Sequence, residues 1–458
     1  MKSKKTILGA SAVALLLVGA VSGCTASSEE ATSVNSEAEQ KTIKVSYLVN
    51  DGFKQLDDLF NKVKPEFEEK NPGVVVELDP ITGTDSDYTT KLSLMHQDPS
   101  TQPDVFYQDS FLVRSDVAAG YLLNLDQYVS EWDEWDMFDE GAKGAGQDAS
   151  GSVYAISMGT DSRGIYYNKP VLEEAGIDLP WQPENWDELM ADVRQIKEST
   201  GEIAFNTYSG NGAGEGAVMQ GFFMFLYGTG EDPLFDNASG KWVIGSQGFR
   251  DSLAAYETLF QEELAAPVEE AADGNMWQKV LGPWIKDGTV AATIDGSWVP
   301  RMWGSAGGDF EWPEYEDEIG VAYMPSQDGG SKVTLSGGWT LALGSETEHP
   351  EEAFAFLTEA LNYENALKFY VDNAQIAVRS DVAQDEAYQS ANKFVPFFTD
   401  LVSSTNFRPA TEDYPRISIA VQQATDDIMF GNKTVEEAAA AYDQAVIDIV
   451  GEENVIRK

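Results

Sequence analysis

Histidine and cysteine, which supply many catalytic and metal-binding groups, are scarce in this chain of 458 residues. The sequence holds two histidines, His96 and His349, and a single cysteine, Cys24. One cysteine excludes an internal disulfide bond and any zinc or iron–sulfur site that needs several thiolates. The sequence also lacks a Gly-x-Ser-x-Gly elbow, a His-x-x-x-His pair and a Gly-Lys-Ser/Thr phosphate loop. We therefore expect no cofactor, no metal site and no hydrolysis by serine, cysteine or metal.

Aromatic and polar residues instead follow the ends of predicted strands. Trp298 comes after a predicted strand at 289–294 and an Asp-Gly-Ser turn, and Trp339 comes after two glycines. An indole ring stacks on the C–H face of a cyclic polyol, while planar Asp, Asn, Gln and Arg groups bond its hydroxyls. Both tryptophans are therefore candidate ligand contacts, and burial in the core is the alternative for each.

The charge balance restricts the partners of the protein. The chain has 77 Asp and Glu residues against 30 Lys and Arg residues, a formal net charge of −47. Such a surface repels phosphate backbones and anionic lipid headgroups, so a nucleic-acid partner is not expected and neutral or cationic ligands remain. Among so many acids, two carboxylates about 5–10 Å apart can always be found, which leaves a glycoside hydrolase as an alternative.

The elements that must position these residues follow a βαβ pattern. Residues 43–49 alternate as in a strand, residues 53–67 have apolar side chains at helical spacing, and residues 74–78 form a second strand. This order predicts an α/β fold with a parallel sheet and crossover helices. Ligands of open α/β sheets bind beyond the carboxyl ends of the strands, which makes Asn50 and Asp51 candidate contacts. Capping of the following helix is the alternative for Asp51.

The first residues have the composition of an export signal. Lysines precede an apolar run at 7–21, which is shorter than the roughly 20 residues of a membrane-spanning helix. The sequence Val-Ser-Gly-Cys that ends at Cys24 resembles a bacterial lipobox, and an ordinary signal peptide cut nearby is the alternative. The resemblance implies a signal peptide at 1–23, a lipid on Cys24 and attachment to the outer face of the cell membrane. The small and acidic residues at 24–40 then form a flexible tether.

The order of segments along residues 41–448 resembles the extracellular solute-binding proteins of ATP-binding-cassette (ABC) importers, in particular the carbohydrate-binding group similar to maltose-binding protein. The segments that carry the resemblance are KTIKVSYLVNDG with NPGVVVEL, QPDVFYQDS with AAGYLLNLDQYV, YAISMGTDSRGIYYNKPVLEEAGI with PENWDELMADVRQIK, DGTVAATIDGSWV, IGVAYMP with GGWTLALGSETEHPEEAFAFLTEAL, and GNKTVEEA. The resemblance implies a non-enzymatic, monomeric protein that delivers a neutral oligosaccharide to permease subunits. Polyamine, iron and peptide are the alternative solutes.

The same resemblance implies a periplasmic-binding-protein-like fold, with two α/β lobes joined by three crossing segments and the ligand in the cleft between them. Crossings are expected near 158–160, 324–331 and 375–379. This division assigns 41–158 plus 332–375 to lobe 1, and 161–323 plus 379–458 to lobe 2.

Several candidate contacts rest on the resemblance. Gln108 and Asp109 match a polar pair that bonds sugar hydroxyls, and Trp298 matches a stacking tryptophan. Asp161 matches an acidic contact near the first crossing, although an ion pair with Arg163 is the alternative. Two regions match poorly: after residue 205 the candidates are Tyr208 and Asn211, and near Ser418 an aromatic platform is absent, so that Tyr414 or Arg416 would replace it.

Overall fold

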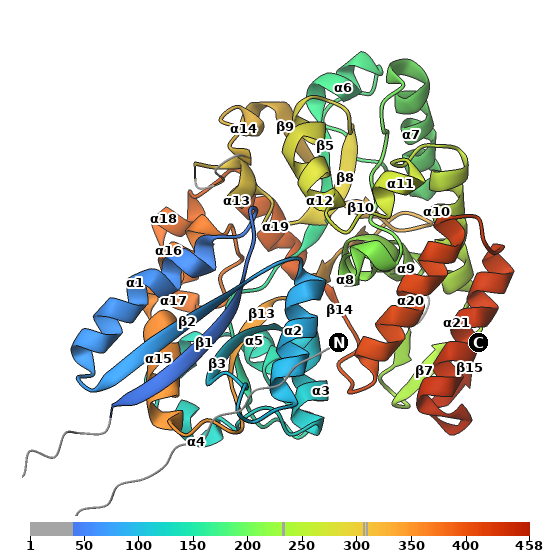
Figure 1. The fold of residues 1–458 in the computed structure, drawn as a ribbon. Coiled ribbons are helices and arrows are strands. Elements are labelled where there is room, and N and C mark those ends of the chain that lie inside the picture. The colour runs from blue at the N-terminus through green and yellow to red at the C-terminus, as the bar shows by residue number, and fades with distance from the viewer. Residues whose placement is uncertain (1–39, 231–233, 306, 308–309) are drawn as a thin grey trace, which may run out of the picture. The chain divides into compact units, whose positions relative to one another are not determined.

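The computed structural model describes residues 40–230, 234–305, 307 and 310–458 (Figure 1). The predictions for the signal peptide, for the lipid on Cys24 and for the tether up to residue 39 lie outside the described residues. Within the described ranges, none of the helices is long and apolar enough to cross a membrane.

Lobe 1 is built on a sheet of five strands in the order β2-β1-β3-β13-β4. The strand β1 is parallel to both β2 and β3, whereas β13 is antiparallel to β3 and β4. The chain therefore leaves this lobe after β4 and returns to add a strand to the middle of its sheet. The bounds of the strands are β1 (Lys41–Val49), β2 (Val74–Thr82), β3 (Val105–Asp109), β4 (Ala155–Ser157) and β13 (Trp339–Leu343).

The first helix of lobe 1, α1, is amphipathic. Its buried side chains Leu56, Phe60, Val63 and Phe67 recur every three or four residues, which places them on one helix face against the sheet. The helices of this lobe are α1 (Gln55–Lys70), α2 (Asp85–His96), α3 (Val113–Ala118), α4 (Asp126–Val129), α5 (Glu140–Ala145), α15 (Pro350–Ala360), α16 (Tyr363–Asp372), α17 (Ser380–Ala383) and α18 (Glu386–Gln389).

Lobe 2 contains an antiparallel sheet in the order β8-β5-β9 and a second sheet in the order β15-β7-β6. The bounds are β5 (Arg163–Asn168), β8 (Ala292–Gly296), β9 (Ile319–Ala322), β6 (Phe235–Asp236), β7 (Lys241–Ile244) and β15 (Val455–Arg457), with the short pairs of β10 (Met324–Pro325) with β11 (Lys332–Val333) and β12 (Leu335–Ser336) with β14 (Asn406–Phe407).

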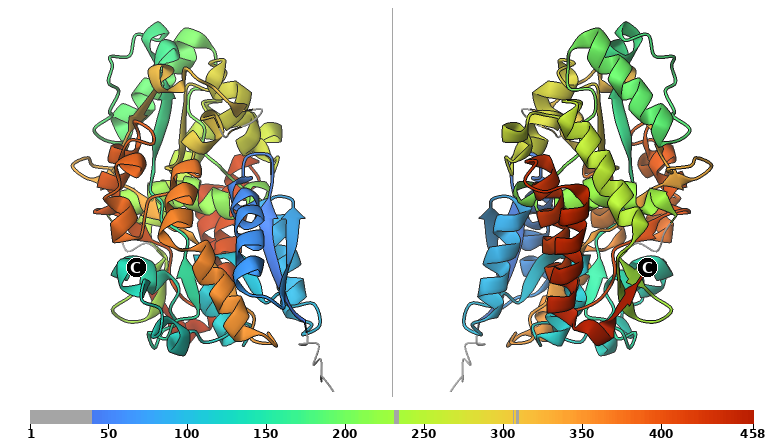
Figure 2. Two further views of the ribbon diagram at one scale, coloured as in Figure 1. Left: turned by 90° about the vertical axis from the view of Figure 1, so that its left-hand side faces the viewer. Right: turned by 90° about the vertical axis from the view of Figure 1, so that its right-hand side faces the viewer.

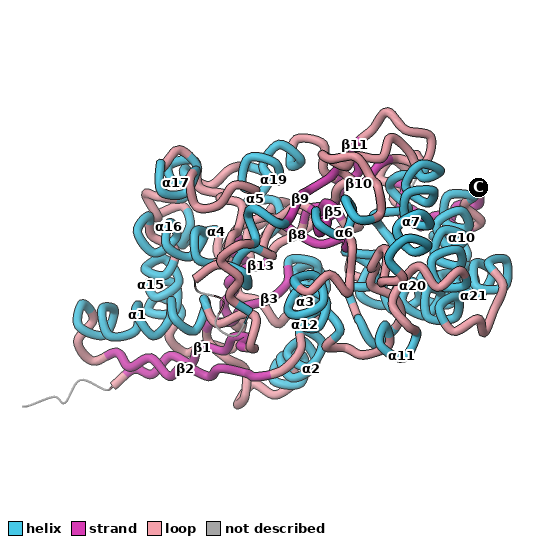
Figure 3. Tube along the Cα trace, turned by 90° about the horizontal axis from the view of Figure 1, so that it is seen from above, coloured by secondary structure: helices cyan, strands magenta, loops and turns pink. Residues whose placement is uncertain are grey.

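The helices of lobe 2 come from the middle and the end of the sequence. They are α6 (Lys169–Glu174), α7 (Trp186–Thr200), α8 (Glu215–Ala217), α9 (Phe223–Leu226), α10 (Gln247–Gln261), α11 (Val268–Ala271), α12 (Met276–Lys279), α13 (Pro300–Trp303), α14 (Tyr315–Glu318), α19 (Val395–Val402), α20 (Tyr414–Met429) and α21 (Val435–Val450). Seen from above, α1, α15 and α16 lie on one side of the central strands β13, β5, β8 and β9, and α7, α10 and α21 lie on the other (Figure 3). Figure 2 shows the green segment that contains α7 above the blue strands β1 and β2.

Two separate hydrophobic cores confirm the predicted α/β fold with two lobes. One core runs from Ile43 to Met158 and from Leu341 to Tyr388. The other runs from Ile165 to Leu335 and from Phe394 to Val455, with Ile376 added. Each core combines stretches of chain that are far apart in sequence, so each lobe depends on at least two passes of the chain.

Two of the predicted lobe boundaries are wrong. Val333 and Leu335 belong to the core of lobe 2, because β11 pairs with β10 and β12 pairs with β14 of that lobe. Val382 and Tyr388 belong to the core of lobe 1, because α17 and α18 pack on α16. The boundaries predicted at 332 and 379 are therefore displaced, and the chain passes between the lobes near 336–338 and after residue 388.

The crossing segments contact one another closely. Thr160 of the first crossing exchanges two backbone hydrogen bonds of 3.0 Å with Ile376, which precedes the last crossing. Gly159 and Gly338 have φ angles of +132° and +141°, and a Cβ atom on Gly338 would lie 2.5 Å from the carbonyl oxygen of Gly159. Only glycine fits at this contact, which brings two of the crossings together at the base of the space between the lobes.

Candidate functional site

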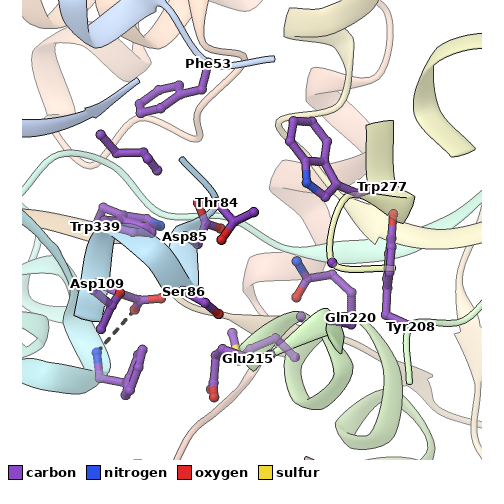
Figure 4. Close-up of a pocket in the computed structure, with 18 of the residues that line it drawn as sticks. Phe53, Thr84, Asp85, Ser86, Asp109, Tyr208, Glu215, Gln220, Trp277 and Trp339 are labelled. Atoms are coloured by element: carbon purple, nitrogen blue, oxygen red, sulfur yellow. Dashed lines mark hydrogen bonds between the residues drawn. The ribbon is translucent and has the colours of Figure 1, made fainter. Parts of the chain in front are cut away.

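A cavity of about 480 Å³ lies where the two lobes meet. In Figure 4, Phe53, Thr84 to Ser86, Asp109 and Trp339 face Tyr208, Glu215, Gln220 and Trp277 across it. The first group comes from lobe 1 and its crossing, and the second from lobe 2. The lobes are therefore joined by the crossings at the base and enclose a cleft that both of them line.

Helix α2 supplies a hydroxyl-rich wall to the cleft. Its start is fixed by a capping box, in which the Thr84 hydroxyl accepts the N–H of Asp87 at 3.1 Å and Asp87 accepts the N–H of Thr84 at 3.0 Å. The residues of α2 that line the cavity recur at helical spacing on one face, and among the described residues their side chains make no hydrogen bond. They are Asp85, Ser86, Thr89, Thr90 and Ser93.

Two tryptophans line the cavity, and each ring packs against another side chain of the protein. Trp339 stacks on Tyr107, with ring centroids 4.5 Å apart and planes at 11°. Trp298 lies against the guanidinium of Arg163, which is 4.9 Å from the ring centroid. These contacts fix the orientation of both indoles, so each presents a held aromatic surface to the cavity.

The Arg163 guanidinium also forms a buried ion pair with Asp161. Asp161 in addition accepts the backbone N–H of Gly337 at 2.9 Å. Asp161 therefore forms the structural ion pair with Arg163 that was the alternative to ligand contact. Asp161 and Arg163 also both line the cavity.

Asp295 is a buried carboxylate of lobe 2 that lines the cavity without an ion pair to a described residue. Tyr208 donates its hydroxyl to Asp295 at 2.8 Å, and the N–H of Gly296 donates to it at 2.8 Å. Burial raises the pKa of Asp295 to about 6, against the opposing effect of these two hydrogen bonds.

A charged network joins the lobes at one end of the cleft. Arg408 of lobe 2 donates to both carboxylate oxygens of Asp109 on β3, at 2.5 and 3.3 Å, and to Glu215 at 3.2 Å. Glu215 also accepts the hydroxyl of Tyr414 at 2.7 Å and that of Ser418. Burial raises the pKa of Glu215, which Arg408, Ser418 and Tyr414 oppose. Burial acts against the charge of Arg408, but Asp109 and Glu215 outweigh it and raise its pKa.

The structure brings together six of the residues predicted from the sequence. Those that line the cavity are Asn50, Asp109, Asp161, Tyr208, Trp298 and Trp339. The predicted contacts outside the lining are Asp51, Gln108, Asn211, Tyr414 and Arg416.

Each of the five that lie outside the lining has a local reason. Asp51 is exposed beside Lys54, 3.9 Å away, and does not cap α1. Gln108 alternates with the lining residues of β3 and is fully buried, with no hydrogen bond to its amide from the described residues. Asn211 bonds Gln423 at 3.1 Å, Arg416 is exposed 3.4 Å from Asp413, and Tyr414 lies behind Glu215.

The sequence reasoning missed several lining residues. The hydroxyls of α2 carried a usable signal, because Ser86, Thr90 and Ser93 repeat at helical spacing. Arg408 and Glu215 carried none, since their pairing depends on contacts between distant segments. Further missed lining residues with aromatic or charged side chains include Phe53, Tyr107, Trp277, Arg163 and Arg301.

Comparisons with known proteins agree with this architecture. The family described as bacterial extracellular solute-binding protein matches residues 51–367. The multiple sugar-binding protein of Streptococcus mutans is 24% identical over 368 residues, which cover 75% of this chain and 77% of that protein. The solved GacH receptor of Streptomyces glaucescens, studied with and without acarbose, has a TM-score of 0.75 at 20% identity and covers 90% of this chain and 100% of its own.

A solute-binding protein from Thermotoga lettingae bound with α-D-tagatose has a TM-score of 0.76 at 23% identity, over 90% of this chain and 100% of that one. At these identities the solved structures support the two-lobed fold, and the family match supports the relationship by sequence.

Proposed function

Because the chain belongs to the bacterial extracellular solute-binding proteins, we propose that it captures a neutral oligosaccharide in the cleft between its lobes and delivers it to the permease subunits of an ABC transporter. The family is one of binding proteins rather than enzymes, so no reaction is assigned to the cleft. The relatives, a multiple sugar-binding protein and a receptor studied with acarbose, support a saccharide as the ligand class.

The observation that carries the proposal is the pairing of held aromatic rings with unpaired hydroxyls in one cavity. Trp298 and Trp339 offer faces for the C–H side of a pyranose, and the α2 hydroxyls offer donors and acceptors to its hydroxyl groups. A site for a peptide or a metal ion would not need stacking rings combined with a row of hydroxyls.

The charges of the lining favour a neutral ligand over an anionic one. Arg163 and Arg408 are already paired with carboxylates, and Arg301 donates to a backbone carbonyl and an amide. An acidic sugar would therefore have to displace an existing partner. The lining carboxylates are Asp85, Asp109, Asp161, Glu215, Asp273 and Asp295.

The length of the hydroxyl-bearing wall favours more than one sugar ring. The lining residues of α2 extend from Asp85 to Ser93, which corresponds to roughly 12 Å of helix axis at 1.5 Å per residue. Linked pyranoses lying along this face would meet a hydroxyl at each helical turn. A di- to tetrasaccharide is the class of ligand that we expect.

A direct test uses a soluble form that begins at Thr25. We expect neutral di- to tetrasaccharides to raise its melting temperature and to be recovered unchanged, because a ligand that binds the folded state stabilises it by mass action. Spermidine and an oligouronate serve as the cationic and anionic controls. Stabilisation by spermidine alone would contradict the proposal, and a shortened sugar would favour the hydrolase alternative.

We also propose that the protein works as a monomer outside the cell, held to the membrane by a lipid on Cys24. The family is extracellular, which supports the location. Labelling of cells with a palmitate analogue should mark the full chain, and Cys24→Ser should abolish the label and release the protein into the medium. A labelled Cys24→Ser variant would contradict the anchor.

A further inference from the structure

The side chain of Arg408 in lobe 2 reaches to a carboxylate of lobe 1. Arg408 follows β14 in lobe 2, its side chain is 6% exposed, and its guanidinium meets the carboxylate of Asp109 at the end of β3 in lobe 1. Two donor nitrogens face two acceptor oxygens, at 2.5 and 3.3 Å. This bidentate geometry is the strongest form of a charge-assisted hydrogen bond, and in a buried position salt screens it little.

We propose that Asp109 and Arg408 form a latch between the lobes, so that Asp109 contributes to sugar capture by holding the cleft closed and not by touching the sugar. This inference rests on the proposed function. It assigns Asp109 a different role from the hydroxyl-bonding one expected from the sequence. Asp109 and Arg408 are positioning residues, since they act on the ligand through the distance between the lobes.

The lobe 2 half of the latch is held in place by its own lobe. Glu215 accepts Arg408 at 3.2 Å, and the hydroxyls of Tyr414 and Ser418 bind Glu215 in turn. All four residues belong to lobe 2, so these bonds survive when the lobes separate. Arg408 is therefore pre-oriented towards Asp109, and closure orders few additional side chains.

Neighbouring contacts from lobe 1 converge on the same place. The ring of Phe111 lies 4.7 Å from the Arg408 guanidinium, and Arg114 donates to the carbonyl of Ala410 at 2.7 Å. Phe111 also meets Tyr414 edge-on, with centroids 5.8 Å apart. The ion pair thus sits inside a packed contact between the segment 109–114 and the segment 408–414, which limits the access of water to it.

The latch predicts an effect on every ligand alike. Closure is common to all sugars that bind in the cleft, so Asp109→Asn should weaken the affinity for a disaccharide and a tetrasaccharide by the same factor. We expect about tenfold to hundredfold, from the typical worth of a hydrogen bond between charged groups. The loss should lie in faster dissociation, because the latch forms after the sugar has entered.

The experiment combines sugar titration with a distance measurement. Glu69→Cys on α1 and Glu174→Cys on α6 place spin labels on exposed positions of the two lobes, in a soluble form that otherwise lacks cysteine. Double electron–electron resonance between the two spin labels then reports the separation of the lobes with and without sugar. Asp109→Asn should shift the population towards longer distances, and Arg408→Lys, which keeps one charged donor, should shift it less.

A matched control is the exposed bidentate pair of Arg194 with Glu262, at 2.6 and 2.8 Å within lobe 2. Glu262→Gln should leave both the affinity and the distances unchanged. Loss of affinity for only one sugar in Asp109→Asn, with unchanged distances, would overturn the latch in favour of direct contact. Equal distances in the parent and in both latch variants would also overturn it. Absence of sugar binding in the parent would instead overturn the proposed function, and the sugar-free distances would still test the latch.

Discussion

The two ends of the cleft each use an arginine of lobe 2 to reach lobe 1, but in different surroundings. At one end, which we call the ionic end, Arg408 lies between Asp109 and Glu215. At the other, the aromatic end, Arg301 lies 4.9 Å from the Phe53 ring centroid. In Figure 4 the labelled residues of the two ends, Asp109 with Glu215 and Phe53 with Trp277, lie at opposite sides of the cavity.

The partners decide how burial affects each arginine. Arg301 donates to the carbonyl oxygen of Gly52 and to the amide of Asn373, both at 3.1 Å. Burial lowers the pKa of Arg301, whereas the two carboxylates raise that of Arg408. Both guanidinium groups lie over an aromatic ring, but Arg408 is held by carboxylates and Arg301 by neutral hydrogen-bond acceptors. The ends should therefore respond differently to substitution.

The largest expected effect is at the ionic end. Arg408→Ala leaves Asp109 and Glu215 without their cation, and breaking a buried ion pair on one side typically costs about 3–5 kcal/mol. Urea unfolding of the soluble form should show this loss. Arg301→Ala leaves only neutral hydrogen-bond acceptors without their donor and should cost less. An equal loss in the two variants would remove the distinction between the ends.

The next effect comes from Asp295, a buried carboxylate that forms no ion pair with a described residue. Because the pKa of Asp295 is raised from 3.8 to about 6, the folded protein holds a proton there that the unfolded chain has released. Stability should therefore fall as the pH rises from about 4 to 6, by about 3 kcal/mol at 1.4 kcal/mol per pKa unit. Asp295→Asn should flatten this part of the profile in urea unfolding at several pH values. An unchanged slope would show that other groups control it.

Removal of a stacking ring should act on binding. Trp298→Ala should weaken sugar affinity by about 1–3 kcal/mol, because it removes an aromatic face from the cavity. The ring also packs on Arg163, so the melting temperature of the sugar-free variant has to be measured beside its calorimetric affinity. Unchanged affinity would refute the role of Trp298.

The smallest effect tests the packing of the aromatic end. A Cβ atom on Gly52 would lie 2.6 Å from the Trp277 ring of lobe 2. Gly52→Ala should therefore push the lobes apart at this end and weaken sugar affinity by about 1 kcal/mol. Gly144→Ala is the matched control, since nothing lies within 4 Å of its added Cβ. Equal affinities in both variants would mean that Trp277 yields without cost.

The sequence predicted those parts of the fold that depend on local pattern. The apolar spacing of α1 and the strand before it gave the correct element types and, with the resemblance, the two-lobed fold. The sequence did not assign α17 and α18, which have four residues each, to the correct lobe. Helices this short bury too few side chains to show a periodic face, and their lobe is decided by packing on α16.

The site was predictable only where one strand or one turn presents a residue to the cleft. Trp298 comes just after β8 and its turn, so local reasoning placed it, whereas Asp161 was placed by the family resemblance. Asp109 was also placed in the cleft, but its partner Arg408 is 299 residues away in the sequence. No spacing rule connects such residues, and the role of Asp109 could not be inferred without the tertiary structure.

The position of β13 bears on how the protein is made. This strand pairs with β3 on one side and β4 on the other, so β4 cannot join the sheet of lobe 1 until residues 339–343 exist. Lobe 2 likewise waits for β15, which pairs with β7. A nascent chain emerging amino terminus first can complete neither domain before most of it has been translated. Contacts between such distant segments form slowly, which prolongs the unfolded interval in which a translocation machinery can engage the polypeptide.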